Sequence, residues 1–319
     1  MSEKRKRIVV FGSFVVDLMA RAPRHPVAGE TVFGSSFRMG PGGKGFNQAV
    51  AAYKAGADVQ IVTALGKDDF SRVALDTMHA LGLSTQSVLV SATEQTGAAL
   101  IIVDERNGQN EIVVIPGACA AMTADDAEAV RPLLEQSDIL LLQLEVGLEA
   151  VERAAQIAKA AGSMVILNPA PVRALSEKVY PMLDLIIPNE TEAERLTGIT
   201  VSDEVAARKA AQWFEFRGVK RVLITLGERG AFLYDAGECR MIPAYPVNCI
   251  DSTGAGDAFC GGLVTGLAEG MCLEQAAQFA SAVAALSVQK LGTAPAMPER
   301  RQIDRFLEAN RIDTNCAGN

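Results

Sequence analysis

The stretch DSTGAGDAFCGG, residues 251–262, places a glycine-rich turn directly before a segment that the sequence predicts to be a helix. Glycines in such a turn let backbone N–H groups converge on an anion, and the dipole of the following helix favours negative charge there. The turn therefore predicts a phosphate site. Its anion hole would be formed by the backbone N–H groups of residues 253–256, which include Gly254, Ala255 and Gly256.

Asp257 adds a carboxylate beside the predicted phosphate site. A negative charge repels a phosphate, but it has a chemical role if it takes the proton from a hydroxyl that attacks the phosphate. On this stretch alone, an aspartate that merely favours the helix dipole explains the residue equally well. A second motif is needed to separate the two interpretations.

The second motif is GPGGKGFNQA, residues 40–49, which precedes a run of small and apolar residues. Repeated glycine lets the backbone approach a ligand, while Lys44 and Asn47 supply a cation and an amide that can bind hydroxyls or phosphate. With both stretches the sequence resembles the ribokinase-like (PfkB) family of sugar and nucleoside kinases. In that family the first signature covers the sugar and the second carries the catalytic base, which implies that Asp257 is the base.

The resemblance includes two further landmarks, PNETEAE at residues 188–194 and ITLGERG at residues 224–230. In the family the asparagine and second glutamate of the first landmark organise magnesium and phosphates. The resemblance thus implies ATP as co-substrate and Mg²⁺ as cofactor. The implied residues are Asn189 near the phosphates, Glu192 acting on Mg²⁺ indirectly, and Thr225 and Gly227 beside the nucleotide.

The resemblance extends from Ile8 to Leu307 and is strongest to ribokinases and their near relatives, because QLE at residues 143–145 and NPAP at residues 168–171 also match them. It implies a set of sugar contacts. These are Asp17, Gly42, Gly43, Asn47, Glu145 and Asp257. A carboxylate such as that of Asp17 can accept several hydroxyl hydrogen bonds at once, although a turn or capping aspartate is the alternative.

The segment GSFVVD, residues 12–17, departs from the family pattern. Ribokinases read Gly-Ser-x-Asn-x-Asp here, so Val15 replaces an amide. An apolar residue cannot hydrogen-bond a hydroxyl, which favours a sugar lacking or repositioning that group by roughly one to a few kcal/mol. The departure makes 2-deoxyribose a candidate beside ribose, and Phe46 in place of a small residue is expected to narrow or reshape the pocket.

Ribokinases also hold a monovalent cation, usually potassium, beside the anion hole. The resemblance implies such a K⁺ site in two loops of this chain. Its residues would be Asp251 and Thr253 in the first loop and Ser287, Lys290 and Gly292 in the second, mostly through backbone carbonyls. Ala296 stands where a side-chain hydroxyl is expected, which removes one possible ligand. We expect potassium activation.

The composition excludes several classes of protein. The formal net charge of −8 leaves no basic surplus for nucleic acid or an anionic membrane. Two histidines, His25 and His79, are too few for a histidine metal site or a Ser-His-Asp hydrolase. The sequence has no leader-like or membrane-spanning apolar run and no Cys-x-x-Cys pair, so a cytoplasmic location is expected.

Short apolar runs alternate with helix-like segments, which predicts a three-layer α/β/α sandwich with a mainly parallel sheet. The predicted strands are 8–12, 59–63, 139–144, 164–168, 185–188 and 222–225, and the predicted helices include 68–81, 148–161, 191–197 and 202–216. Two β-rich segments, about 14–39 and 96–115, do not fit the alternation. The resemblance implies that they form a small β-sheet lid over the sugar and join two subunits, giving one domain over residues 1–319 and a homodimer.

Two unrelated classes are disfavoured, since GSF at residues 12–14 lacks the dinucleotide fingerprint and GKG at residues 43–45 lacks the hydroxyl residue of a P-loop. Within the family, a nucleoside kinase or a sugar-phosphate kinase stays open. Arg38 or Arg106 could bind the phosphate of a phosphorylated sugar, although solvated lid charges explain them too. A non-catalytic sugar or nucleotide sensor is the remaining alternative. We predict an ATP-dependent kinase acting on a terminal hydroxyl of a small sugar, a pentose such as ribose or 2-deoxyribose.

Overall fold

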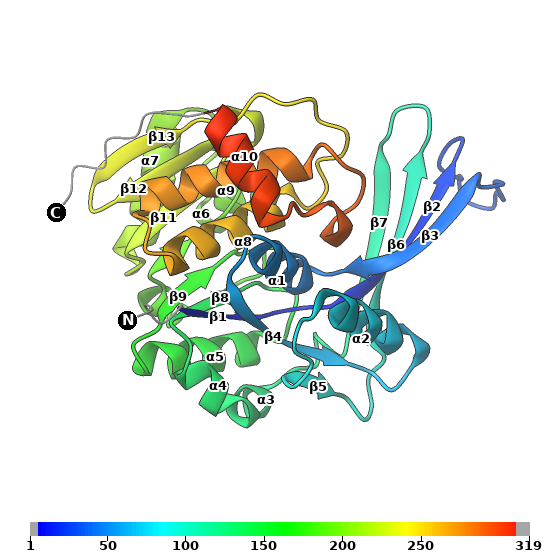
Figure 1. The fold of residues 1–319 in the computed structure, drawn as a ribbon, viewed down its shortest axis with the longest axis horizontal. Coiled ribbons are helices and arrows are strands. Elements are labelled where there is room, and N and C mark those ends of the chain that lie inside the picture. Colours follow the sequence, from blue (N-terminus) through cyan, green and yellow to red (C-terminus); the bar gives the residue numbers. More distant parts are fainter. Residues whose placement is uncertain (1–5, 311–319) are drawn as a thin grey trace.

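The computed structural model describes residues 6–310. Figure 1 shows a large sheet between two layers of helices, and a smaller sheet that projects from one side of this body. The large sheet has the strand order β13-β12-β11-β10-β9-β8-β1-β4-β5. The strands are β1 Arg7–Phe11, β4 Asp58–Leu65, β5 Val88–Val90, β8 Ile139–Leu142, β9 Met164–Leu167, β10 Leu185–Ile186, β11 Arg221–Thr225, β12 Ala231–Asp235 and β13 Glu238–Ile242.

The predicted sandwich with a mainly parallel sheet is confirmed. All neighbouring strands from β5 to β11 pair in parallel, and antiparallel pairing occurs only at one edge, between β11 and β12 and between β12 and β13. The six predicted strands are all present. The edge hairpin of β12 and β13 was not predicted.

Helices cover both faces of the large sheet because its strands are apolar on both sides. In β1, Ile8 and Val10 belong to one buried cluster while Val9 and Phe11 belong to the other. The first face is covered by α1 Lys44–Lys54, α2 Asp69–Leu81, α8 Ala255–Ala268, α9 Leu273–Ser287 and α10 Arg300–Ala309. The second is covered by α3 Ala124–Ala129, α4 Arg131–Glu135, α5 Leu148–Ala160, α6 Glu190–Thr197 and α7 Glu204–Phe216.

Helices α1 and α8 lie unusually close together, which matters for the site. A Cβ atom added to Gly261 of α8 would lie 2.5 Å from the Cβ of Ala51 in α1. Only glycine permits this approach, and it brings the first turns of both helices, including Asn47 and Asp257, into contact. The two signature motifs thus meet through a small-residue helix contact.

The smaller sheet, here called the lid sheet, has the order β3-β2-β6-β7. Its strands are β2 Val15–Ala22, β3 Ser36–Gly42, β6 Thr96–Asp104 and β7 Asn110–Gly117. They overlap the two β-rich segments predicted at about 14–39 and 96–115, although β3 continues to Gly42 and β7 to Gly117, so the expected small sheet is confirmed. The assignment of the whole chain to one domain stays a prediction. Among residues 6–310, no helix is long and apolar enough to cross a membrane.

Candidate active site

The predicted site residues gather at the carboxyl ends of the parallel strands, where ligands bind in open α/β sheets. The segment leading to Asp17 follows β1, Glu145 follows β8, and Asn189 follows β10. Asn189 forms an isolated parallel bridge with Thr225 at the end of β11. Residues more than 200 positions apart in sequence therefore border one region.

Asp257 lies in the first turn of α8 and is only 6% exposed. Its Oδ2 accepts a hydrogen bond from Asn47 Nδ2 at 3.0 Å, and its Oδ1 accepts one from Gln48 Nε2 at 2.9 Å. Burial raises the pKa of the Asp257 carboxyl, while Lys44 and the two amides oppose this shift. The carboxylate is thus desolvated, oriented and partly charge-compensated, as a base must be.

Asp17 of β2 reaches the same region because Gly42 of β3 has no side chain. A Cβ atom on Gly42 would lie 2.3 Å from an Asp17 carboxylate oxygen. Burial, followed by the charges of Glu145 and Asp257, raises the pKa of Asp17 to about 6. Within the described part of the chain its carboxylate has no hydrogen bond or ion pair, so its acceptor sites are open to a ligand.

Glu145 is bound to the start of α1. One of its oxygens accepts hydrogen bonds from the Ser13 hydroxyl and, at 2.9 Å, from the backbone N–H of Lys44. This negative charge at a helix N-terminus is favourable by itself. The structure therefore gives Glu145 a structural role, and its predicted sugar contact stays a prediction.

Lys44 is the cation at the centre of these carboxylates. Burial disfavours its charged form, but Asp257, Glu145 and Glu192 outweigh that effect and raise the pKa of the Lys44 ammonium. The described residues form no ion pair with its Nζ atom. Lys44 is therefore a charged group available to a phosphate, and its central place could not be read from the sequence motif alone.

The predicted nucleotide residues occupy helix and strand ends. Asn189 is the N-cap of α6: its side chain accepts from Glu192 N–H at 2.8 Å, and Glu192 accepts from Asn189 N–H at 2.9 Å. This reciprocal capping box explains both residues structurally. Burial raises the pKa of Glu192, and the charge of Lys44 lowers it. Gly227 begins a short 3₁₀ turn after β11.

The anion turn differs in detail from the expectation. The N–H of Thr253 donates to Asp251 Oδ1 at 2.9 Å, and the N–H of Ala255 donates to the Ser252 carbonyl at 3.2 Å. The N–H groups of Thr253 and Ala255 are therefore already hydrogen-bonded within the turn. The N–H groups of Gly254 and Gly256 have no partner in the described chain, so only these two of the four predicted donors are available to an anion. Gly43, predicted to touch the sugar, is the N-cap of α1.

The two predicted cation loops are joined by Asp251. Its Oδ2 accepts from the Gly292 N–H at 2.9 Å, and Thr253 is held by its other oxygen. Burial disfavours the Asp251 carboxylate, but these hydrogen bonds outweigh it and lower its pKa. The Ser287 carbonyl already accepts from the Lys290 N–H at 3.2 Å. The loops are thus adjacent, as the expected site requires.

Three residues that the sequence relates to the sugar pocket can be placed in the structure. Phe46 is fully buried and packs edge-on against Phe14, with ring centroids 5.2 Å apart, so its side chain does not line an open surface, and its expected effect on the pocket stays a prediction. Arg106 is bound to Asp104 on the lid sheet. Val15 is 4% exposed and lies on the same face of β2 as Asp17, because the two residues are two positions apart.

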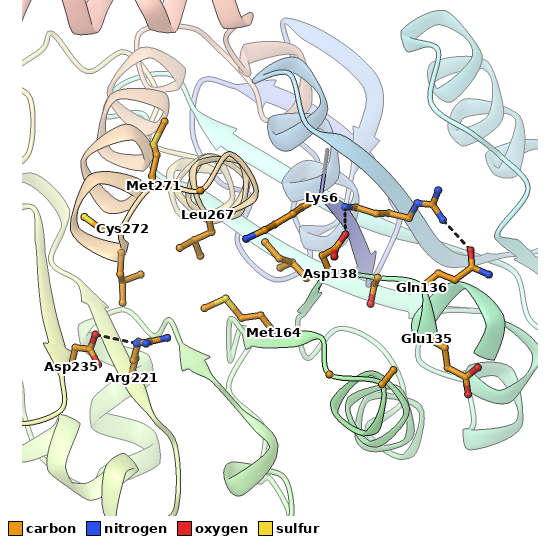
Figure 2. Close-up of a pocket in the computed structure, with 17 residues that line it drawn as sticks. Lys6, Glu135, Gln136, Asp138, Met164, Arg221, Asp235, Leu267, Met271 and Cys272 are labelled. Atoms are coloured by element: carbon orange, nitrogen blue, oxygen red, sulfur yellow. Dashed lines mark hydrogen bonds and ion pairs between the residues drawn. The ribbon is translucent and has the colours of Figure 1, made fainter. Parts of the chain in front are cut away.

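A separate open cavity of about 1010 Å³ lies at the opposite end of the large sheet (Figure 2). It is bordered by Arg7, Met164 and Arg221, which begin β1, β9 and β11. Arg221 forms an ion pair with Asp235 there at 3.0 Å. The cavity lies at the amino ends of the strands, so it is not part of the candidate active site.

Comparisons with known proteins agree with this geometry. The model of the family described as pfkB family carbohydrate kinase matches residues 5–300. A ribokinase of Haemophilus influenzae is 41% identical over 304 residues, covering 95% of this chain and 99% of the relative. A deoxyribokinase of Salmonella typhi is 36% identical over 304 residues with the same coverage.

Solved structures show the same fold. The structure of Arabidopsis thaliana ribokinase complexed with ribose and ATP has a TM-score of 0.88 and 30% identity, covering 96% of this chain and 99% of that one. The match covers nearly the whole chain, and Asp257 lies within the residues that the family model matches. The chain is an ATP-dependent sugar kinase, and it belongs to the pfkB family of carbohydrate kinases.

Proposed function

We propose that this enzyme transfers the γ-phosphate of ATP to a terminal hydroxyl of a pentose, with Asp257 as the base. The observation that carries the proposal is the pairing of Asp257 with Asn47. The Nδ2 group of Asn47 holds the carboxylate, while its Oδ1 atom is buried and has no hydrogen-bond partner. A buried acceptor without a partner costs about 1–3 kcal/mol. A sugar hydroxyl would satisfy it within reach of the base.

The remaining roles follow from the charges at the site. Asp17 would accept sugar hydroxyls, and Lys44 with the N–H groups of Gly254 and Gly256 would surround the transferred phosphoryl group. A Mg²⁺ ion, held mainly by ATP phosphates, would lie near Glu192, whose raised pKa reflects a half-buried carboxylate that a cation would stabilise. Bound Mg²⁺ would neutralise charge on the phosphates.

The proposal is tested by measuring ADP release from ATP and Mg²⁺ with a panel of ribose, 2-deoxyribose, other pentoses, hexoses and nucleosides. We expect turnover with a pentose. Turnover only with a nucleoside or a phosphorylated sugar would keep the kinase and reject the pentose assignment. Absence of turnover with every compound would favour the non-catalytic sensor.

Val15 provides a prediction about which pentose is preferred. Its side chain packs with Met19, Ala99 and Ile101 on the Asp17 face of the lid sheet. A sugar hydroxyl placed against this apolar group finds no partner, which disfavours ribose relative to 2-deoxyribose. Val15→Asn should shift the ratio of kcat/KM values toward ribose by about tenfold or more. An unchanged ratio in competition assays would show that Val15 does not read the sugar.

Potassium should activate the enzyme. The expected ligands, carbonyls of the two loops joined by Asp251, lie beside the anion turn, where a cation would stabilise developing negative charge. Replacing K⁺ by tetramethylammonium at constant ionic strength should lower kcat severalfold. Equal kcat in both salts would reject the site, and Ala296 would then be the residue to examine first.

We further propose a cytoplasmic homodimer joined through the lid sheet. Met39, Leu18, Leu100 and Val113 form one row across its four strands, opposite to the face that carries Asp17. Met39, Leu100 and Val113 are 53%, 48% and 61% exposed. An apolar row of this kind marks a protein contact surface.

Leu100→Asp should therefore convert the dimer to a monomer, because it places a charge in the centre of the row. Sedimentation equilibrium measures the change. Val205→Asp is the matched control, since Val205 is an exposed apolar residue of α7 outside the lid sheet. A monomeric wild-type protein would reject the proposed interface.

A further inference from the structure

Gln48 makes contacts that the pentose kinase proposal does not use. Its Nε2 atom donates to Asp257 Oδ1 at 2.9 Å and lies 3.0 Å from Asn168 Oδ1. Its Oε1 atom accepts from Gln143 Nε2 at 2.6 Å. Gln48 and Gln143 are fully buried, and Asn168 is 8% exposed. Amides from α1 and from the ends of β8 and β9 thus converge behind the carboxylate.

We propose that Gln48 is a positioning residue for Asp257, that Asn168 fixes the orientation of the Gln48 amide, and that Gln143 supplies the donor to its oxygen. The inference rests on the proposed role of Asp257 as the base. It assigns to the chain a buried amide relay, defined as Gln48, Gln143 and Asn168, which contacts no substrate itself.

The relay leaves the Gln48 amide only one favourable orientation. If the amide turned over, its oxygen would face both the carboxylate of Asp257 and the Oδ1 of Asn168, which is repulsive in a buried site. Gln143 does not itself decide this orientation, because its Oε1 atom is buried without a hydrogen-bond partner among the described residues and its amide can turn. Asn168 is fixed in turn, because its Nδ2 donates to the Ile187 carbonyl at 2.8 Å. The Gln48 Nε2 donor that faces Asp257 is therefore held by Asn168, which is anchored in turn at the end of β10.

Asn47, the neighbouring donor to Asp257, is not held in this way. Its Oδ1 atom has no partner among the described residues, so its amide can adjust when a sugar binds. The two donors thus have different tasks. Asn47 joins the base to the substrate, whereas Gln48 keeps the carboxylate in one rotamer when the substrate site changes. A base held in line with a hydroxyl reacts faster than one that samples several rotamers.

The amide of Gln48 also stabilises the ionised form of Asp257 against burial. Several charged or titratable groups act on this carboxyl from the surrounding elements. They are Lys44 of α1, Asp17 of β2, Glu145 after β8, Glu192 of α6 and Cys260 of α8. Only Lys44 among them is a cation. Removing the Gln48 donor therefore leaves the buried Asp257 carboxylate near three other carboxylates with one hydrogen bond fewer. The pKa of Asp257 should rise as a result.

The test compares Gln48→Met with the wild-type full-length protein. Methionine keeps the length and apolar volume of the side chain but removes the amide. We expect kcat at pH 7 to fall by about 10–100-fold, with KM for sugar and ATP nearly unchanged. We also expect the acidic limb of the kcat profile to move up by about 1–2 pH units.

A second readout does not depend on turnover. Carbon-13 NMR of protein with labelled aspartate carboxyls, assigned with Asp257→Asn, follows the titration of Asp257 directly. Gln48→Met should raise that midpoint. If wild-type protein phosphorylates no sugar, the proposed function fails, while this titration still decides whether Gln48 stabilises the carboxylate.

Two further variants complete the design. Gln143→Met leaves both hydrogen bonds to Asp257 in place but removes the donor to Gln48 Oε1, so a severalfold decrease in kcat is expected. This variant also tests the proposal if Gln48→Met does not fold. Thr265→Val is the matched control, because Thr265 is buried at the same α1–α8 contact and bonds only the backbone of Gly261 and Ala52. Wild-type kcat and titration in Gln48→Met, or a loss in Thr265→Val as large as that in Gln48→Met, would overturn the proposal.

Discussion

Asp257→Asn is expected to lower turnover by about 10²–10⁴-fold while leaving the protein folded. The amide cannot take a proton from the attacking hydroxyl. It can still fit, because its oxygen can accept from the fixed Gln48 amide while its NH₂ group faces Asn47. Asn47 can turn its amide to present the unpaired Oδ1 atom as the acceptor. ADP release with saturating pentose, ATP and Mg²⁺ measures the loss.

We also expect that Asp257→Asn does not lower the thermal unfolding temperature of the protein. Burial raises the pKa of Asp257, so the ionised carboxylate opposes folding near neutral pH. The neutral amide removes that cost, and the variant should unfold at the same temperature as the wild type or above it. A loss of activity without a loss of stability separates a catalytic role from a structural one.

Asp235→Asn is the matched control for charge removal. Asp235 lies on β12 at the far end of the sheet and pairs with Arg221. Its variant should keep full turnover. If Asp257→Asn retained activity within about tenfold of the wild type, the base would have to be sought elsewhere, since general base catalysis contributes more than that.

The sequence predicted the large sheet well because a parallel sheet covered on both faces needs short, continuous apolar runs. The strand at residues 185–188 proved shorter, with β10 ending at Ile186. Pro188 has no N–H to continue a ladder. The hairpin of β12 and β13 was missed, since an antiparallel edge pair follows β11 without the intervening helix that signals a parallel strand.

The candidate site was predicted only in part, because sequence motifs name residues but not their contacts. Gln48 lies 209 positions from Asp257, and their hydrogen bond depends on the close packing of α1 on α8. No local pattern contains that contact. The capping box of Asn189 and Glu192, by contrast, is a local pattern, because an asparagine followed three residues later by glutamate can be recognised in the sequence as a helix start.

Asp17→Asn should weaken sugar binding and stabilise the free protein in the same experiment. The carboxylate is half-buried, has no partner among residues 6–310, and its pKa is raised to about 6. Replacing it by an uncharged amide of similar shape removes a strong acceptor for sugar hydroxyls. We expect KM for the sugar to rise by about 10–100-fold, since a hydrogen bond to a charged group is worth about 1.5–3 kcal/mol.

The effect on stability has a definite sign. A folded-state pKa of about 6 lies above the unfolded value of 3.8, so the folded protein binds more protons between these pH values. The free energy of unfolding therefore falls as pH rises from about 4 to about 6, by at most about 3 kcal/mol from this group. In Asp17→Asn this contribution to the pH dependence of the free energy of unfolding is absent. The variant should be the more stable protein at pH 7 and should match the wild type at pH 4.

The sugar changes this balance because it donates hydroxyls to the ionised form of Asp17. In the wild type, KM for the sugar should rise by about tenfold for each pH unit below 6, as protonation of Asp17 competes with binding. The Asp17→Asn variant should show no such dependence. Parallel pH profiles in both proteins would thus contradict the assignment. Divergent profiles together with the stability difference would show that this carboxylate is kept in an unfavourable state until a sugar hydroxyl binds it.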